Sequence, residues 1–512
     1  MSGEHTRAAQ LLAALAEAQP DQVDIARKAL SEAIGAGQMD LALALARSMP
    51  ASKLPGDARL LLAGSEIRRG HPERSLPWLT PSGENGDLTF LSPLVTAWSA
   101  ADRGNVDQAI STIDELPRNS LLAPMASEER AFLLLKARRS AEAEPLARQV
   151  IGHAGGREQR LRLAFADAFL GAGDRQRALM IIEGMGEGEA AARQRIMAGK
   201  TSGLAVDSLP KAYAEVINAL AADLMRMPRA APPIGLVQIA RYVDPQNNGT
   251  TALLALLLSR QGRDREALAL LARVPASEPL IGQVRDVQTR VLTGNKKFDE
   301  AYGIAAAAAA ARDAEPTDYS RLGDVLQAMK RPAAAADAYG RAIALAQAQG
   351  QRSELWTLML LRANALEDAN RWPEARQTLQ QALAIAPEQP LLLNFMGYGE
   401  LERGENMDSA EAMIRKASEL APDDASITDS LGWAEFKRGK VDQAIETLQR
   451  AAEKDPDQAE IQEHLGDALY ESGRRYEARF AWNAALVTAE DDIANRVKAK
   501  LVSGLTTANA AP

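Results

Sequence analysis

Apolar and polar residues alternate along this chain with the period of amphipathic helices, most clearly between residues 424 and 456. Two apolar stripes at helical spacing lie there, separated by Gly439 and followed by Pro456. The residues of these stripes are Ile427, Leu431, Ala434, Val441, Ile445, Leu448 and Ala452. A glycine between the stripes suits a left-handed residue at a helix end, and a proline after them stops the second helix. The pattern predicts two short helices joined as a hairpin.

The same hairpin pattern returns three times between Pro387 and Ala485. Glycines recur at spacings of 35 and 34 residues, and two sets of alanines recur at 34. The recurring residues are Gly397, Gly432 and Gly466; Ala410, Ala444 and Ala478; Ala417, Ala451 and Ala485; and Pro387, Pro422 and Pro456. Because a side chain at the glycine position would hold the two helices apart, small residues here are predicted to be steric requirements, and Trp482 is expected to fill the place of Leu448.

A period of 34 residues with this signature resembles the tetratricopeptide repeat, a helix-turn-helix unit that buries its apolar face only by stacking on neighbours. The resemblance is strongest over residues 356–489 and looser from Asp21 onward. It implies an all-α fold, an α-solenoid of helical hairpins forming a right-handed superhelix, that binds protein partners. The segment 394–424 also looks like the C-terminal repeats of bacterial tetratricopeptide proteins, many of which act in envelope assembly or polysaccharide export.

The repeat predicts five regions along the chain. A capping helix is expected in 1–22, divergent repeats in 23–188, regular repeats in 248–489, and a second capping helix with a disordered tail in 490–512. Between the two sets of repeats, residues 189–247 break the rhythm with many glycines and three closely spaced prolines. This segment is read either as an irregular helical unit that joins two arms, with helices at 209–227 and 234–243, or as an insertion in a loop.

Composition narrows the possible partners and compartments. The 59 basic and 68 acidic residues give a net charge of −9, which disfavours nucleic acid as a partner. No apolar stretch is long enough for a membrane span, and the first ten residues lack the features of a secretory signal. We therefore expect a cytoplasmic protein, or a periplasmic one if an N-terminal signal is missing from this sequence.

The sequence offers no catalytic constellation and no cofactor or metal site. Cysteine is absent, and the four histidines lie in different units. His464 is interpreted as a partly exposed polar residue of the last repeat. No nucleophile elbow, zinc-binding helix pair or phosphate-binding loop is present. Acidic pairs such as Asp423–Asp424 stand at helix starts, where they favour the helix dipole.

The first helices of the repeats are expected to line the concave side and to present equivalent positions in rows. The three rows are Asn394, Asp429 and Glu463; Tyr398, Trp433 and Asp467; and Leu401, Phe436 and Tyr470. Together they predict a groove for an extended or helical peptide that carries a few basic residues. The alternative for Leu401, Phe436 and Tyr470 is packing between neighbouring helices.

These patterns lead to one preferred function and two alternatives. The preferred one is a non-catalytic scaffold that binds a protein or peptide on the concave face, in the setting of envelope assembly or polysaccharide export that the resemblance implies. The alternatives are the repeat arm of an enzyme complex and a regulatory sensor of a signalling peptide. An enzyme needs a catalytic domain for which the repeats leave no room, and a transcriptional sensor needs a basic DNA-binding helix that neither end offers.

Overall fold

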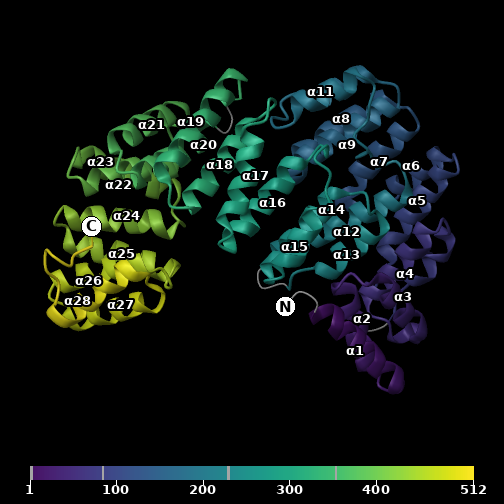
Figure 1. Ribbon diagram of the computed structural model, residues 1–512, viewed down its shortest axis with the longest axis horizontal. Coiled ribbons are helices and arrows are strands. Elements are labelled where there is room, and N and C mark those ends of the chain that lie inside the picture. Colours follow the sequence, from purple (N-terminus) through teal and green to yellow (C-terminus); the bar gives the residue numbers. More distant parts are fainter. Residues whose placement is uncertain (1–3, 83–85, 228–230, 352–354, 512) are drawn as a thin grey trace. The chain divides into compact units, whose positions relative to one another are not determined.

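The computed structural model describes residues 4–82, 86–227, 231–351 and 355–511, and every regular element in these ranges is a helix (Figure 1). The chain divides into two compact units, Met1–Arg321 and Leu322–Pro512. Each unit is described by itself. The boundary falls within α18 (Pro316–Ala328), not in the irregular segment 189–247.

The described residues of the first unit form seventeen α-helices before α18. They are α1 (Glu4–Ala18), α2 (Val23–Gly35), α3 (Met39–Ser48), α4 (Gly56–Arg68), α5 (Ser92–Asp102), α6 (Val106–Asp114), α7 (Ala126–Lys136), α8 (Ser140–Gly152), α9 (Glu158–Gly171), α10 (Arg175–Ile182), α11 (Glu189–Met197), α12 (Leu209–Arg226), α13 (Ile234–Val243), α14 (Asn248–Arg260), α15 (Asp264–Leu271), α16 (Ile281–Gly294) and α17 (Phe298–Ala309). Short 3₁₀ turns connect some of them.

In the second unit, the part of the chain that the structure describes forms ten α-helices after α18. They are α19 (Pro332–Ala348), α20 (Leu355–Asp368), α21 (Trp372–Ile385), α22 (Pro390–Glu402), α23 (Met407–Leu420), α24 (Ala425–Lys437), α25 (Val441–Lys454), α26 (Ala459–Glu471), α27 (Arg475–Thr488) and α28 (Asp491–Ser503). Successive helices pack as pairs, such as α24 with α25 and α26 with α27, and each pair packs on the next. The chain is thus an all-α solenoid of helical hairpins.

The turn inside most of the described hairpins has a residue in the left-handed region. In the first unit Gly70, Gly104 and Gly173 have φ values of 78°, 90° and 90°, and Arg138, one period after Gly104, has φ 60°. In the second unit Lys330 and Asn370 occupy the same turn position, as do the later glycines Gly404, Gly439 and Gly473. The turn therefore keeps its geometry where the glycine has been lost, at some conformational cost to the non-glycine residue.

The small residues inside the second unit are steric requirements, as predicted. A Cβ atom on Gly432 would lie 2.6 Å from Leu448 Cγ, and one on Gly397 would lie 2.8 Å from the carbonyl oxygen of Ala410. At Gly466 the equivalent neighbour is the Trp482 ring. The expectation that Trp482 takes the place of Leu448 is confirmed.

One hairpin of the first unit has lost its second α-helix. After α4 the chain forms two 3₁₀ turns, η2 (Pro72–Arg74) and η3 (Leu76–Leu79). Pro72 and Pro77 lack the backbone donors that an α-helix needs beyond its first turn, so the chain is held in tighter turns. Ser75, at the position where the repeat carries alanine, remains buried, so the packing register continues through this irregular hairpin.

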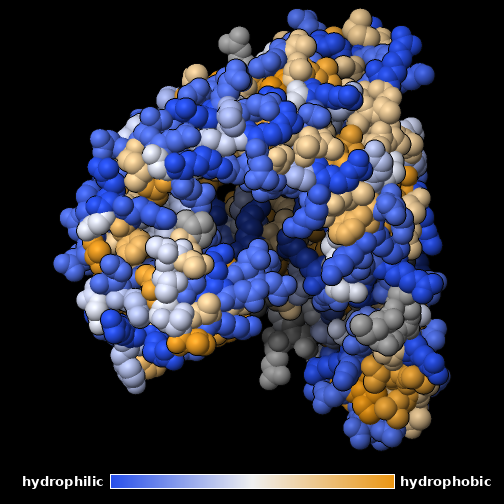
Figure 2. Space-filling model, turned by 60° about the vertical axis from the view of Figure 1, so that its left-hand side comes forward, coloured by the Kyte–Doolittle hydropathy of each residue, from blue (hydrophilic) through white to orange (hydrophobic). Residues whose placement is uncertain are grey.

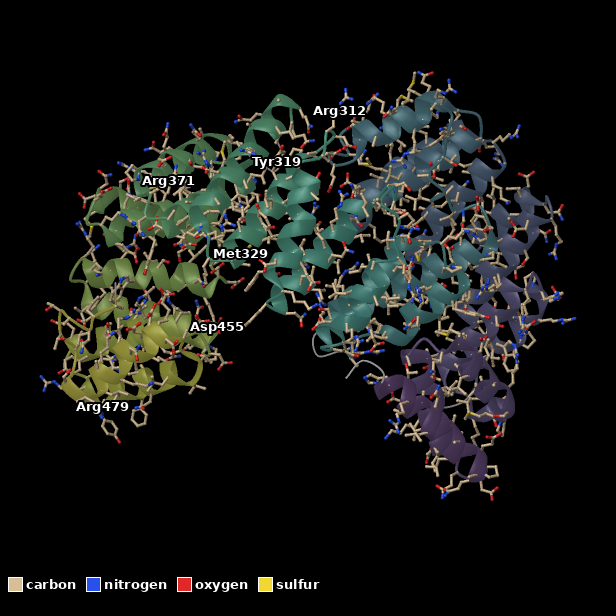
Figure 3. All side chains as sticks on the ribbon, in the orientation of Figure 1. Arg312, Tyr319, Met329, Arg371, Asp455 and Arg479 are labelled. Atoms are coloured by element: carbon tan, nitrogen blue, oxygen red, sulfur yellow. The ribbon has the colours of Figure 1, made fainter. Side chains whose placement is uncertain are left out.

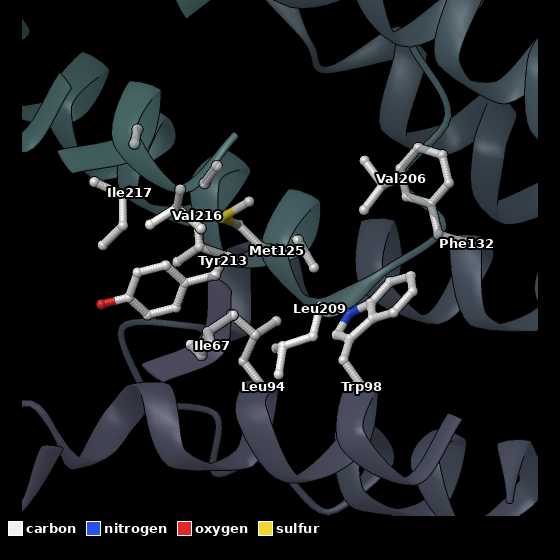
Figure 4. Packing of buried hydrophobic residues seen from close by; sticks show 14 of the residues in the cluster. Ile67, Leu94, Trp98, Met125, Phe132, Val206, Leu209, Tyr213, Val216 and Ile217 are labelled. Carbon is white, nitrogen blue, oxygen red and sulfur yellow. The ribbon is translucent and has the colours of Figure 1, made fainter. Parts of the chain in front are cut away.

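The irregular segment belongs to the hydrophobic core of the first unit. Its α12 packs on α4, α5 and α13, and α13 packs on α2 and α4. Tyr213 and Ile217 are fully buried, and the Tyr213 hydroxyl donates to the carbonyl of Leu60 at 2.9 Å. Figure 4 shows the α12 side chains Tyr213, Val216 and Ile217 among residues of the earlier helices such as Ile67 and Leu94. Helices α12 and α13 therefore pack into the first unit as a hairpin, and the segment is not a loop insertion.

Candidate protein-interaction surface

The nine residues of the predicted groove lie on α22, α24 and α26 of the second unit, but most of them are not open to solvent. Leu401, Asp429, Trp433, Glu463 and Asp467 are buried. The remaining four, Asn394, Tyr398, Phe436 and Tyr470, are half-buried. A groove lined by all three rows is therefore not exposed in this structure. Whether these residues bind a partner stays a prediction.

Helix α28 covers the part of the rows that lies on the last repeat. Lys500 is fully buried, and its Nζ atom lies 2.6 Å from Glu463 Oε1 and 2.7 Å from Asp467 Oδ2. Arg496 also donates to Glu463, at 2.8 and 3.0 Å. The two basic residues are four positions apart, so they project from one face of α28. The expected capping helix is present, and its Arg496 and Lys500 supply the cations that pair with Glu463 and Asp467.

The pKa values of the two buried carboxylates under α28 shift in opposite directions, although the cations lower both. Burial by itself raises the pKa of Glu463, but the hydrogen bonds from Arg496 and Lys500 outweigh it and lower that pKa. At Asp467 burial dominates over Lys500, and the pKa is raised. Asp467 also accepts a hydrogen bond from Trp482 Nε1 at 3.0 Å.

The tail after α28 is ordered in this structure, contrary to the expectation of a disordered tail. The backbone N–H of Ala511 donates to Asp467 Oδ2 at 3.1 Å, and Ala511 is buried. Asn509 stabilises the intervening turn because its side chain donates to the Gly504 carbonyl at 2.9 Å and accepts from the Thr506 N–H at 2.7 Å. By accepting this hydrogen bond, the buried carboxylate of Asp467 holds the tail against α26.

Trp433 lies between two other rings and is almost completely buried. Its ring stacks on His464 with a centroid distance of 4.1 Å and on Phe436 at 4.9 Å. His464 Nδ1 lies 2.9 Å from Asp429 Oδ2. Burial would lower the pKa of His464, but Asp429 outweighs burial and raises it. The interpretation of His464 as a partly exposed residue is therefore wrong: it fastens α26 to α24.

Upstream of α28 the inner face keeps an acidic strip, which we define as Glu402, Asp429 and Glu460. Within the described residues, Glu402 and Glu460 form no ion pair. Burial, and after it the carboxylates of Glu460, Glu402 and Asp429, raise the pKa of the half-buried Tyr398 hydroxyl. Burial and the carboxylate of Glu367 likewise raise the pKa of Glu402. The strip therefore favours the approach of a cation.

Beside the acidic strip, Asn394 Oδ1 and His464 Nε2 are among the buried polar atoms that lack a hydrogen-bond partner in the described residues. Because a buried polar atom without a partner costs free energy, a ligand that supplies a donor or acceptor there would gain affinity. Sequence reasoning placed Asn394 and Tyr398 here but missed Glu402, Glu460 and His464. Extending each row by one helical turn would have found Glu460, which lies four residues before His464.

In the first unit, the carboxylates of Glu128 and Glu129 differ from the exposed Glu402 of the acidic strip because they are buried. Each has a hydrogen-bond partner: Trp98 Nε1 donates to Glu129 at 2.6 Å, and Arg157 donates to Glu128 at 2.7 and 2.9 Å. Burial, and after it the charge of Glu128, raises the pKa of Glu129 to about 8. These groups belong to the interior.

Among the described residues no helix has the length and apolarity of a membrane span. Within the same ranges, no three potential metal-ligating side chains lie close enough together to hold an ion.

Solved structures with a similar course of the chain have low sequence identity and modest superposition scores. The Cut9–Hcn1 hetero-tetramer structure of APC/C matches with 15% identity, 99% of this chain, 94% of that chain and a TM-score of 0.41. Yeast Tom70 matches with 13% identity, 80% and 95% coverage and a TM-score of 0.41. Human IFIT1 in complex with m7Gppp-AAAA matches with 14% identity, 85% and 95% coverage and a TM-score of 0.35. No curated protein matches the sequence.

Three segments of the sequence match repeat families. Residues 94–158 and 315–388 each match the family described as tetratricopeptide repeat, and residues 432–473 match the one described as TPR repeat. The first segment covers helices α5 to α8, whose turn Arg138 shares the left-handed conformation of the glycine turns. The third contains Gly432 and Gly466, whose close packing against the second helix of each hairpin is described above. Repeat signature and hairpin packing agree, and the chain is a member of the tetratricopeptide-repeat superfamily.

Proposed function

We propose that this protein is a non-catalytic interaction scaffold whose second unit binds a basic segment of a partner protein on the acidic strip. Tetratricopeptide repeats are typically interaction modules, which supports the general role. The specific surface is supported by one observation above all. The same inner face, one repeat further on, already holds a basic helix, because Glu463 and Asp467 enclose Lys500 of α28.

The repeat register relates the part of this face that α28 covers to the part that lies upstream of α28. Asp429 lies one period before Glu463, and Tyr398 lies two periods before Asp467. Positions that bind cations in the last repeat therefore recur upstream, where the described residues supply only the imidazole of His464 to Asp429. A partner that brings Lys or Arg side chains to Glu402 and Glu460 would neutralise carboxylates that stand unpaired at present.

The geometry of α28 indicates what such a partner segment looks like. Arg496 and Lys500, four positions apart, reach Glu463 from one face of a helix. We therefore infer an amphipathic helix with basic residues four apart as the partner motif. An acidic surface repels phosphates, so nucleic acid is not the expected ligand of this face.

Affinity capture with matched variants tests this surface. The double variant Glu402→Lys/Glu460→Lys reverses two charges on the acidic strip, and Glu446→Lys/Glu453→Lys makes the same net change on the exposed outer side of α25. Proteins retained by the unaltered chain and by the α25 control should be lost from the strip variant. Equal retention by all three chains would show that the strip is the wrong surface.

The pathway of the scaffold remains a hypothesis drawn from the resemblance to bacterial repeat proteins. Envelope assembly, polysaccharide export, an arm of an enzyme complex and a peptide sensor all use a protein-binding inner face. Identifying the captured proteins by mass spectrometry decides between them, and fractionation of cells decides the compartment.

A further inference from the structure

The outer face of α27 in the last repeat carries a stripe of exposed apolar side chains. Tyr476, Phe480 and Val487 are 76%, 62% and 81% exposed. Their spacings of four and seven residues place them along one face of the helix. The rings of Tyr476 and Phe480 pack edge to face with a centroid distance of 5.0 Å. We call these three residues the α27 stripe.

The preceding repeat shows that the fold does not require this stripe. One period earlier the same three positions are Asp442, Glu446 and Glu453, all exposed on α25. The hairpin of α24 and α25 forms with polar residues at these positions. Packing within the unit therefore does not explain why the same positions on α27 are apolar. The face of the molecule seen in Figure 2 is largely hydrophilic, with apolar residues in separate patches. A contiguous exposed apolar stripe at the end of a solenoid marks an interaction surface.

The charges at the two ends of α27 indicate which partner fits. Arg475 and Arg479 are exposed near its start, and Glu490 and Asp491 are exposed just after its end. Arg479, labelled in Figure 3, donates to the Leu501 carbonyl at 2.7 Å, which leaves the rest of its guanidinium available. Within the described residues Glu490 and Asp491 form no ion pair. The helix is thus basic at one end and acidic at the other.

A helix with this arrangement is complementary to a second copy of itself in the antiparallel direction. Pairing centred between residues 481 and 482 places Tyr476 opposite Val487 of the other copy, and Phe480 opposite Asn483 and beside the small Ala484. The same pairing brings Arg475 of each copy toward Glu490 and Asp491 of the other. Both contacts occur twice around a two-fold axis, as in an isologous interface.

We propose that the chain forms a two-fold symmetric homodimer through antiparallel contact of the α27 stripe with its copy. The stripe lies on α27, away from the acidic strip on the inner helices, so the dimer neither requires nor excludes the peptide binding proposed above. The apolar contact supplies affinity, and the charged ends set the antiparallel direction.

Sedimentation velocity or light scattering on the full chain over a range of concentrations tests the dimer. The unaltered chain should dimerise in a concentration-dependent manner, and Phe480→Glu should be a monomer with an unchanged helical spectrum. The control Glu446→Lys, at the equivalent position of the preceding repeat, should dimerise like the unaltered chain. A chain that stays monomeric at every concentration, or a dimer that persists in Phe480→Glu, would overturn the proposal.

Charge reversal tests the direction of pairing. Arg475→Glu should weaken the dimer by roughly tenfold or more, because each copy then faces like charges at both ends. Adding Asp491→Arg to the same chain should restore dimerisation. A double variant as weak as Arg475→Glu alone would contradict the antiparallel arrangement.

Discussion

At the scale of single residues, the repeat is preserved as backbone geometry more than as residue identity. Arg138 and Lys296 adopt the left-handed conformation at turn positions where other hairpins have glycine. The turns at Gly70, Gly104 and Gly173 keep the glycine of the repeat, whereas the turn at Arg138 does not. When the glycine is replaced, the repeat pattern can no longer be recognised at that turn in the sequence. The hydrogen bonds around the turn nevertheless maintain its left-handed backbone conformation.

Replacing Arg138 with glycine should therefore stabilise the first unit. Among the described residues the Arg138 side chain forms no hydrogen bond or ion pair that the change would remove, and relief of the left-handed strain outweighs the added freedom of the unfolded chain. We expect a gain of about 0.5–1 kcal/mol in the free energy of unfolding, measured by urea denaturation. The reverse change at the equivalent turn, Gly104→Arg, should cost a similar amount. Destabilisation by Arg138→Gly would refute this view of the turn.

Glu129 should make the stability of the first unit depend on pH. Its pKa is about 8 in the folded chain, well above the ordinary value of 4.5, because of burial and the neighbouring Glu128. Between these two values the unfolded chain releases the proton more readily, so rising pH lowers the free energy of unfolding. Glu129→Gln keeps an acceptor for Trp98 and removes this titration. The free energy of unfolding of the variant should rise relative to that of the unaltered chain as the pH increases from about 5 to about 9. If the two free energies depended on pH in the same way, the raised pKa of Glu129 would be contradicted.

At the scale of elements, helices that the repeat pattern does not include pack onto the hairpins of both units. In the first unit α12 and α13 pack against α2, α4 and α5. In the second, α28 lies on α26 and α27. The sequence predicted each of these helices nearly to its ends, because local periodicity encodes helices. It did not predict what they cover, since that depends on contacts between residues more than a hundred positions apart, such as Tyr213 with Leu60.

The role of α12 in the core can be measured with Ile217→Ala. Ile217 is fully buried in the first unit, so truncation should lower the free energy of unfolding by about 2–4 kcal/mol through lost burial and the cavity left behind. The control Met227→Ala alters an exposed side chain just after the same helix and should change stability by less than about 0.5 kcal/mol. If the two variants were equally stable, the segment would be a peripheral insertion.

The attachment of α28 depends on Lys500. Lys500→Met would leave Glu463 and Asp467 buried without their shared cation, which should cost about 3–5 kcal/mol. Lys498→Met, an exposed position on the same helix, should have little effect. Urea denaturation measures the loss, and protease cleavage near residue 490 reports whether α28 has detached. Unchanged stability and cleavage in Lys500→Met would mean that the ion pairs do not hold this helix.

At the scale of the whole molecule, the sequence predicted a repeat protein and its register, while the groove of its C-terminal repeats stays a prediction. It could not predict that Trp433 would be buried between Phe436 and His464, or that α28 would carry the cations for Glu463 and Asp467. Rows of equivalent residues follow from the register, but their exposure depends on what packs above them. Glu402 and Glu460 are the carboxylates of the acidic strip that we propose for a partner, because Asp429 is buried and paired with His464.

The most direct test of that surface is equilibrium binding of a helical peptide with lysines four residues apart to the full chain. The account predicts binding that weakens as salt is added, and a loss of roughly tenfold or more in Glu402→Gln/Glu460→Gln. A peptide with glutamine in place of each lysine should bind as weakly as that variant does. Equal affinity of the lysine peptide for the unaltered chain and for the variant would contradict the central claim that the acidic strip recognises a basic helix.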